Sequence, residues 1–377
     1  MNGADFIVIG GGVAGLSAAA ALAPHGRVVV LEAEEALGYH SSGRSATFSH
    51  YGIGNDTVRA LTAWSRDRFA PGIAARAPAL FIATEAMLSA LGSLEAEMGR
   101  FSESLERVGE ARMVELFPPL RTGSGAAVAG CLDADGLRLD SDAMLQAYAR
   151  GVRAAGGEVL TGRRIVSVET GWTVTTEAGE AWQAAVLVNA AGAWADGLAR
   201  LAGVEPLGLT PLRRTIVVVD PPAGADIRSW PFVKTAVDDF YILPESGRLA
   251  ASPVDEVESE ACDARPEDYD VALAAWKIEA YTTLSVARIA HRWAGLRTFA
   301  ADRVPVAGFA PGAKGFFWIA GQGGYGLQTA PAMAAVAEAL ITGRPWPAGL
   351  AERGADPAEV GIGRLAVRAS SPRQPLP

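Results

Sequence analysis

The chain has 377 residues, of which 50% are apolar and 20% charged, and its 33 basic and 42 acidic side chains give a net charge of −9. A chain of this length and apolar content buries a sizeable core in one large or two packed domains, which excludes intrinsic disorder for its bulk. The dispersed negative charge offers no basic stripe to phosphate groups, so we expect no nucleic-acid partner.

The cysteines and histidines argue against disulfide and metal chemistry. Cys131 and Cys262 lie far apart without a CxxC motif, and the histidines show no spacing typical of metal ligands. We therefore expect neither a disulfide framework nor a metal site. Lysine is scarce, and its only positions are Lys234, Lys277 and Lys314.

Residues 6–23 form an unbroken, weakly polar run that has three interpretations. A signal peptide needs a positively charged start, whereas only Asp5 precedes the run closely. A membrane span needs more length and fewer Gly and Ala residues. The third interpretation is a strand over residues 5–9, a glycine turn and an alanine-rich helix from Leu16, followed by a strand over residues 27–31. We adopt it, and expect a cytoplasmic protein without integral membrane association.

The turn carries the pattern GxGxxG between a strand and a helix, with an acidic residue about 20 positions further on. Gly10 makes the tight turn, Gly12 lets the backbone approach a pyrophosphate, and Gly15 lets the helix pack against the strand. The helix N-terminus favours phosphates, and Glu32 can accept hydrogen bonds from an adenosine ribose. The pattern predicts a dinucleotide site.

Residues 38–45 indicate which dinucleotide is bound. A separate NAD domain would continue with further βαβ repeats, whereas this chain continues into a polar, glycine-rich loop with several hydroxyls and one arginine, Arg44. Such a loop suits a cofactor that extends beyond its pyrophosphate. The alternative is a solvated surface loop.

The remaining elements alternate between helices and strands. We expect a helix over 141–155, strands over 158–161, 164–169, 173–176 and 185–188, and a helix from Trp194. We then expect strands over 214–219, 240–243 and 248–252, an acidic solvated loop over 255–270 and a helix over 270–284. Strands over 304–308 and 316–320, a glycine turn over 322–326 and a helix over 327–342 follow. No repeat or long linker interrupts them.

Six segments, at 26–32, 38–45, 58–62, 186–194, 293–299 and 315–329, resemble the FAD-dependent D-amino-acid oxidase superfamily, and in detail the bacterial D-arginine dehydrogenases. The resemblance implies an α/β fold in which a glutathione-reductase-like, FAD-binding Rossmann domain is interleaved with an antiparallel-sheet substrate domain. The implied FAD domain comprises 1–78, 140–204 and 295–345, the substrate domain 79–139 and 205–294, and a C-terminal tail 346–377.

The resemblance also implies which residues hold the cofactor, and we expect the FAD to be non-covalent. The implied residues are Gly10, Gly12, Val13, Ala14, Gly15, Glu32, Ala33, His40, Ser41, Ser42, Gly43, Arg44, Ser45, Val166, Ala191, Gly192, Trp194, Gly323, Gly324, Tyr325, Gly326, Leu327 and Gln328. Those from Gly324 to Gln328 are expected to bring helix-start amides near the pyrimidine oxygen of the flavin.

A flavin that oxidises an amino acid needs the substrate carboxylate held in place, which a bidentate arginine and a tyrosine hydroxyl do well. The resemblance places Arg214, Tyr241 and Arg297 in this role. Arg213 should face the other way by strand alternation. His50 and Tyr51 are candidates to reach the substrate from a loop, His50 as a proton acceptor.

Two departures from the D-arginine dehydrogenases bear on the substrate. Ala79 stands where those enzymes carry a glutamate for the substrate side chain, and Ile53 stands where a tyrosine is expected. We therefore expect oxidative deamination of a D-amino acid with a neutral or apolar side chain. Alternatives are an oxidase or dehydrogenase of a secondary amine such as sarcosine or proline, and a non-catalytic flavin-binding subunit.

The electron acceptor is left unidentified by the sequence. Sarcosine oxidases hold a lysine over the flavin for reaction with oxygen, and the strand that corresponds to it here, 248–252, has none. This favours an acceptor other than oxygen.

Overall fold

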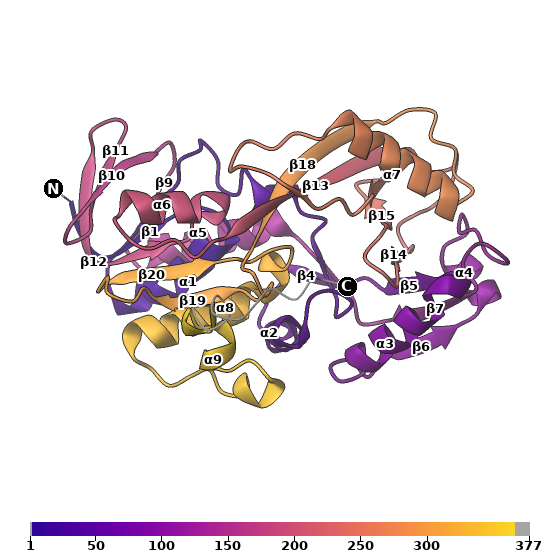
Figure 1. Cartoon of the computed structure of the whole chain (residues 1–377), viewed down its shortest axis with the longest axis horizontal. Coiled ribbons are helices and arrows are strands. Elements are labelled where there is room, and N and C mark those ends of the chain that lie inside the picture. The colour runs from indigo at the N-terminus through magenta and orange to yellow at the C-terminus, as the bar shows by residue number, and fades with distance from the viewer. Residues whose placement is uncertain (1, 366–377) are drawn as a thin grey trace.

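The computed structural model describes residues 2–365 and has two lobes (Figure 1). An eight-stranded sheet forms the core of one lobe and a nine-stranded sheet that of the other. A small third sheet contains β3 (Phe48–Ser49), β4 (Ala74–Arg76) and β8 (Leu137–Leu139). The predicted mixed α/β fold is confirmed. No helix of the described residues is long and apolar enough to cross a bilayer.

The eight-stranded sheet has a parallel centre. Its strands are β1 (Asn2–Ile9), β2 (Val28–Leu31), β9 (Glu158–Leu160), β10 (Ile165–Glu169), β11 (Thr173–Thr176), β12 (Ala181–Asn189), β19 (Val306–Phe309) and β20 (Phe316–Ala320). β1 pairs in parallel with β2 and β12, whereas β10 and β11 form an antiparallel edge. Helices cover both faces of a parallel sheet, which is why residues 6–9 and 28–31 are apolar without alternation.

The first glycine turn sends the chain from β1 into α1 (Val13–Leu22). Leu16 and Leu22 of this helix pack in one core with Val8, Val30 and Met333. The helices that share this core are α2 (Asp56–Arg66), α5 (Ser141–Ala154) and α8 (Gly326–Thr342). On the other face lies α6 (Ala195–Leu201). The run at residues 6–23 is therefore a strand, a turn and a helix, as predicted.

The nine-stranded sheet collects strands from distant parts of the chain. They are β5 (Ala79–Ala83), β6 (Leu105–Val108), β7 (Ala129–Asp133), β13 (Thr210–Val219), β14 (Phe232–Thr235), β15 (Tyr241–Glu245), β16 (Arg248–Ser252), β17 (Val257–Glu258) and β18 (His291–Phe299). Its helices are α3 (Leu88–Met98), α4 (Glu110–Leu116) and α7 (Asp268–Tyr281).

One domain boundary expected from the sequence, between residues 294 and 295, falls inside a strand of this sheet. β18 pairs with β13 along its whole length, from His291 to Phe299. Residues 295–299, which the sequence assigned to the FAD domain, therefore belong to the nine-stranded sheet. The tail expected over 346–377 begins with ordered turns and α9 (Pro357–Val360), while its residues 366–377 lie outside the described part.

Candidate functional site

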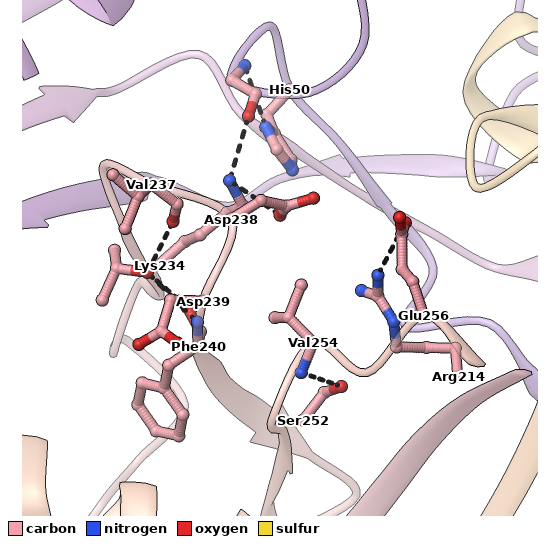
Figure 2. A network of polar contacts seen from close by, with 12 residues as sticks. His50, Arg214, Lys234, Val237, Asp238, Asp239, Phe240, Ser252, Val254 and Glu256 are labelled. Atoms are coloured by element: carbon pink, nitrogen blue, oxygen red, sulfur yellow. Dashed lines mark hydrogen bonds and ion pairs between the residues drawn. The ribbon is translucent and has the colours of Figure 1, made fainter. Parts of the chain in front are cut away.

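A cavity of about 440 Å³ is lined by residues of both large sheets and of the loops between them. At one end it touches the first glycine turn, and at the other it touches β13, β14, β15 and β18. Figure 2 shows side chains at this second end, which we call the substrate end.

Gly10 and Gly15 of the first turn make the close backbone contacts that their spacing predicts. Gly10 has φ +115°, and a Cβ there would lie 2.4 Å from the Ala190 carbonyl oxygen. A Cβ on Gly15 would lie 2.0 Å from the Gly10 carbonyl oxygen, so the helix could not approach the strand. Gly12 lines the cavity itself. Only glycine fits at the positions of Gly10 and Gly15, and the absence of a side chain at Gly12 leaves the backbone open to the cavity.

The polar loop after β2 closes over this end rather than lying free in solvent. The Ser42 hydroxyl accepts a hydrogen bond of 3.0 Å from the Val13 amide at the start of α1. The Arg44 guanidinium donates to the carbonyls of Ala264 (3.0 Å) and Ala294 (3.1 Å), which ties the loop to the other lobe. The Glu32 carboxylate lines the cavity and accepts from the Gly11 and Glu34 amides at 2.5 and 2.8 Å.

Two arginines meet at the substrate end on neighbouring strands. Arg214 on β13 and Arg297 on β18 both line the cavity, and one oxygen of Glu256 accepts from them at 3.1 and 3.0 Å. Burial and the charge of Arg214 lower the pKa of Arg297 to about 10, which keeps it charged at neutral pH. Arg213 instead pairs with Glu267 and with Asp270 on α7, so strand alternation is confirmed.

Glu256 corrects one prediction. The stretch 255–270 was expected to be a solvated loop, and Glu258, Glu260 and Asp263 within it are exposed. Its ends differ, because the carboxylate of buried Asp255 accepts from the Thr215 amide at 2.7 Å and Asp270 is also buried. Glu256 bonds Arg214, Arg297 and Arg303. Glu256 and Asp270 compensate arginines of the interior, which is the usual reason for a carboxylate to leave water, whereas the Asp255 carboxylate is satisfied by Thr215.

Tyr241 and two residues that sequence reasoning missed complete this end. Tyr241 on β15 is buried and lines the cavity beside Lys234 of β14, its antiparallel partner. The Lys234 ammonium lies 3.2 Å from an oxygen of Asp238. The charges of Lys234, Arg214 and Arg297 outweigh the effect of burial and lower the pKa of Asp238 to about 2. Lys234 lines the cavity, so the lack of lysine on 248–252 no longer argues against oxygen.

His50 lines the cavity, but not as the proton acceptor that we expected. Its Nδ1 accepts a hydrogen bond of 3.0 Å from the Gly52 amide, so the single proton of the neutral ring is on Nε2. Burial and the charge of Lys234 lower the pKa of His50 to about 3. At neutral pH His50 is therefore a hydrogen-bond donor through Nε2.

This lowered pKa makes a stability prediction. Between about pH 6.5 and about pH 3 an unfolded histidine binds a proton that buried His50 does not. The free energy of unfolding therefore falls by about 1.4 kcal/mol for each unit by which the pH is lowered in this range. Chemical unfolding near pH 7 and near pH 5 measures this loss. We expect His50→Gln to lose less stability than the wild type between the two pH values. The matched control is His291→Gln at an exposed position. An unchanged pH dependence in His50→Gln would contradict the burial of a neutral ring.

Most of the predicted site residues meet in the cavity. Those that line it are Gly10, Gly12, Val13, Ala14, Glu32, Ala33, His40, Ser41, Ser42, Arg44, Ser45, His50, Ala191, Gly192, Trp194, Arg214, Tyr241, Arg297, Gly323, Gly324, Gly326, Leu327 and Gln328.

The other five do not line it. Gly15 and Gly43 serve close backbone contacts, at the Gly10 and Gly38 carbonyls. The Val166 side chain is 48% exposed, and its neighbour Ile165 lines the cavity instead.

Two tyrosines are directed elsewhere by aromatic packing. Tyr51 stacks on Phe101, with ring centroids 5.8 Å apart, and the Arg66 guanidinium lies over its ring. Tyr325 packs edge-on against Phe299. Tyr51 therefore does not line the cavity from which it was expected to contact the substrate. The Tyr325 ring packs against Phe299 instead of lining the cavity beside Gly324 and Gly326.

Comparison with known proteins identifies the architecture. Residues 5–340 match the family model described as FAD dependent oxidoreductase. The chain belongs to this family. An uncharacterized oxidoreductase, YurR of Bacillus subtilis, is 26% identical over 255 residues, which cover 64% of this chain and 63% of that protein. An L-2-hydroxyglutarate dehydrogenase of Escherichia coli K12 is 26% identical over 218 residues, covering 54% and 50%. The matches thus span about half to two thirds of these relatives.

Solved structures share the fold over nearly the whole chain. The L-proline dehydrogenase of P. horikoshii has a TM-score of 0.77 at 19% identity, covering 94% of this chain and 97% of its own. The glycine oxidase of Geobacillus kaustophilus has a TM-score of 0.77 at 21% identity, covering 94% and 99%. An L-alpha-glycerophosphate oxidase of Mycoplasma pneumoniae, solved with FAD bound, has a TM-score of 0.79 at 18% identity, covering 91% and 95%.

The cavity of this FAD dependent oxidoreductase fits its cofactor. Thr298 and Gln322 line it, and within residues 2–365 the Thr298 hydroxyl and both polar atoms of the Gln322 amide are buried without a hydrogen-bond partner. Buried polar groups are normally paired, so these atoms suit the polar edge of a bound group. The open backbone at Gly12 and the start of α1 suit its pyrophosphate. These residues would hold the FAD that the family binds.

Proposed function

We propose that the protein oxidises a D-amino acid at its α-carbon to an imino acid, which water hydrolyses to a 2-oxo acid and ammonia. The observation that carries the proposal is the pair of arginines at the substrate end of the FAD cavity beside Tyr241, in which Arg214 is buried and the Arg297 side chain is 12% exposed. Glu256 accepts from each guanidinium and the Asp255 carbonyl also accepts from Nε of Arg214, so both guanidiniums keep N–H groups that can bind one carboxylate. FAD, when bound, supplies the hydride acceptor.

The lining of the substrate end favours a neutral or apolar substrate side chain. Phe48, Ile53, Ile216 and Phe232 line it. Ala79 is fully buried on β5, so this position provides no carboxylate for a cationic side chain. The D configuration is supported by the resemblance of six segments to D-arginine dehydrogenases. The electron acceptor is left open.

A secondary amine is the second candidate substrate. Two proteins of this fold carry names that include such substrates, the L-proline dehydrogenase and an iminodiacetate oxidase from Chelativorans. The same arginine pair would bind their carboxylates. A flavin-binding subunit without activity is a third candidate. Within residues 2–365 Nη1 of Arg214 and Nη2 of Arg297 have no hydrogen-bond acceptor in a cavity that they line, which argues against it.

Anaerobic mixing of the holoenzyme with candidate substrates tests the proposal. The panel contains D- and L-amino acids, sarcosine, proline and 2-hydroxy acids, and the loss of oxidised-flavin absorbance is followed. We expect D-amino acids with neutral or apolar side chains to bleach the flavin fastest. Bleaching only by sarcosine or proline would favour the secondary amine, and bleaching only by 2-hydroxy acids would contradict amine oxidation. No bleaching at all would favour the binding subunit.

A further inference from the structure

Lys234 is the one lysine among residues 2–365 that lines the FAD cavity. It lies on β14 two residues after Phe232, which lines the cavity as well, so alternation directs both side chains inward. Its antiparallel partner Tyr241 brings it to the same face as the proposed carboxylate site. The Lys234 side chain is only 6% exposed. Burial of a lysine there is costly, so a role in the site is a reasonable expectation.

The contacts of the Lys234 amine leave one direction open. Nζ lies 3.2 Å from Oδ1 of Asp238 and donates to the Gly52 carbonyl at 3.4 Å (Figure 2). A neutral amine has two N–H groups and one lone pair, and these two acceptors use both N–H groups. No further partner of Nζ lies within residues 2–365. The lone pair therefore has no protein donor, on a side chain that lines the cavity.

The groups around Lys234 favour its neutral form more than water does. Burial lowers its pKa, and Arg214 and Arg297, on β13 and β18, lower it further, while Asp238 opposes them. His50, on the loop that follows β3, is neutral at neutral pH. Burial raises the pKa of Tyr241 on β15, so its hydroxyl is neutral as well. Asp238 is the one anion that faces this amine, and it is ionised.

We propose that Lys234 is the catalytic base that takes a proton from the ammonium group of the amino-acid substrate, and that Asp238 is its positioning residue. The inference rests on the proposed function, because it needs an amine bound at the arginine pair. An ammonium nitrogen has no lone pair, and so cannot stabilise the α-carbon as a hydride leaves it.

The step balances as a simple proton transfer. An N–H bond of the substrate breaks, its electron pair stays on the substrate nitrogen, and a new N–H bond forms at Nζ of Lys234. That electron pair then forms the C=N bond as the hydride of the α-carbon, with its two electrons, passes to FAD. Lys234 returns its proton to water after the product has left.

The test is the pH dependence of anaerobic flavin reduction at subsaturating substrate. In the wild type the rate should rise with pH through a pKa below the usual lysine value, because only neutral Lys234 accepts a proton. In Lys234→Ala the rate near neutral pH should fall by roughly 10²- to 10⁴-fold. The rise should move up to the pKa of the substrate amine in solution, since only substrate that arrives neutral then reacts.

Two further variants and one addition separate catalysis from structure. Methylamine should restore the rate of Lys234→Ala in proportion to the concentration of neutral amine, which a structural defect would not allow. Asp238→Asn should shift the rise to lower pH, because Lys234 loses the charge that favours its protonation. Lys277→Ala is the matched control, since Lys277 is a buried lysine paired with Asp239 that does not line the cavity.

A readout that needs no turnover is proton uptake on binding of a non-oxidisable carboxylic acid, measured by calorimetry in buffers of different ionisation heat. We expect uptake in the wild type and none in Lys234→Ala. An unchanged pH profile in a folded, FAD-replete Lys234→Ala would overturn the proposal. So would a variant slowed only in the reaction of reduced flavin with oxygen. If no amine reduces the wild-type flavin, the proposed function has failed instead.

Discussion

Replacement of Arg297 with methionine should raise the substrate concentration for half-maximal flavin reduction by roughly 30- to 5,000-fold, which corresponds to about 2–5 kcal/mol. The guanidinium is almost buried in the FAD cavity and shares Glu256 with Arg214. A carboxylate that loses one of two charged, bidentate donors in a site of low dielectric loses most of its binding energy. Anaerobic titrations of the flavin would give the affinity.

The variant should remain folded and loaded with FAD. Glu256 keeps Arg214 and Arg303 as partners, so no carboxylate is left uncompensated. The glycine turn and α1, which suit the pyrophosphate, are separate elements at the other end of the cavity. Arg292→Met is the matched control, because Arg292 lies on the same strand and pairs with the exposed Asp268 outside the cavity. Equal effects of the two variants would remove Arg297 from the carboxylate site.

The parts of the site that follow from local sequence were predictable. The turn from β1 to α1 is set by glycines whose missing side chains leave room for the Ala190 and Gly10 carbonyls. Strand alternation alone separated Arg214 from Arg213. Such features depend on residues that are neighbours in the chain, and the fold reproduces them directly.

The parts that depend on long-range pairing were not predictable. All four residues of β14 are buried, so its sequence does not alternate between polar and apolar residues as a half-exposed strand does. β14 pairs with β5, which lies about 150 positions earlier in the chain. Nothing in the local sequence around Lys234 and Asp238 therefore indicated that they belong to the candidate site. A polar aromatic residue such as Tyr51 next to His50 looked equivalent to it, but a bend in the chain turned the two rings into different surroundings.

The buried carboxylates at the ends of the acidic stretch 255–270 were not predictable for the same reason, although most of the stretch is exposed as expected. Glu256 is read as a surface charge in any local window, because its partners on β13 and β18 are distant in the sequence. A buried lysine or arginine normally has an acidic partner, so Arg213 and Arg214 on a predicted strand indicated that some acidic residues are buried beside them. Which carboxylate pairs with which arginine is decided only by the packing of the sheet.

Glu256→Gln should destabilise the protein by about 3 kcal/mol, since it removes the carboxylate that compensates the partly buried guanidiniums of Arg214 and Arg297. The amide retains one acceptor oxygen but presents an N–H₂ group where three arginines converge. Burial raises the pKa of Glu256, but the Arg303 hydrogen bond and the charges of Arg297 and Arg214 outweigh it and lower the pKa. Denaturant unfolding of the holoenzyme near neutral pH measures the loss.

A bound ligand distinguishes this loss from ordinary damage to the core. A carboxylic acid that binds Arg214 and Arg297 supplies a negative charge in place of the missing one, so it should stabilise Glu256→Gln more than it stabilises the wild type. Glu267→Gln is the control, because Glu267 pairs with Arg213 on the opposite face of β13 and is largely exposed. Equal stabilisation by the ligand in Glu256→Gln and in the wild type would mean that Glu256 acts on the fold alone. A larger gain would show that Glu256 and the substrate carboxylate bind the same two arginines, and that Glu256 sets the charge of the site to match one carboxylate.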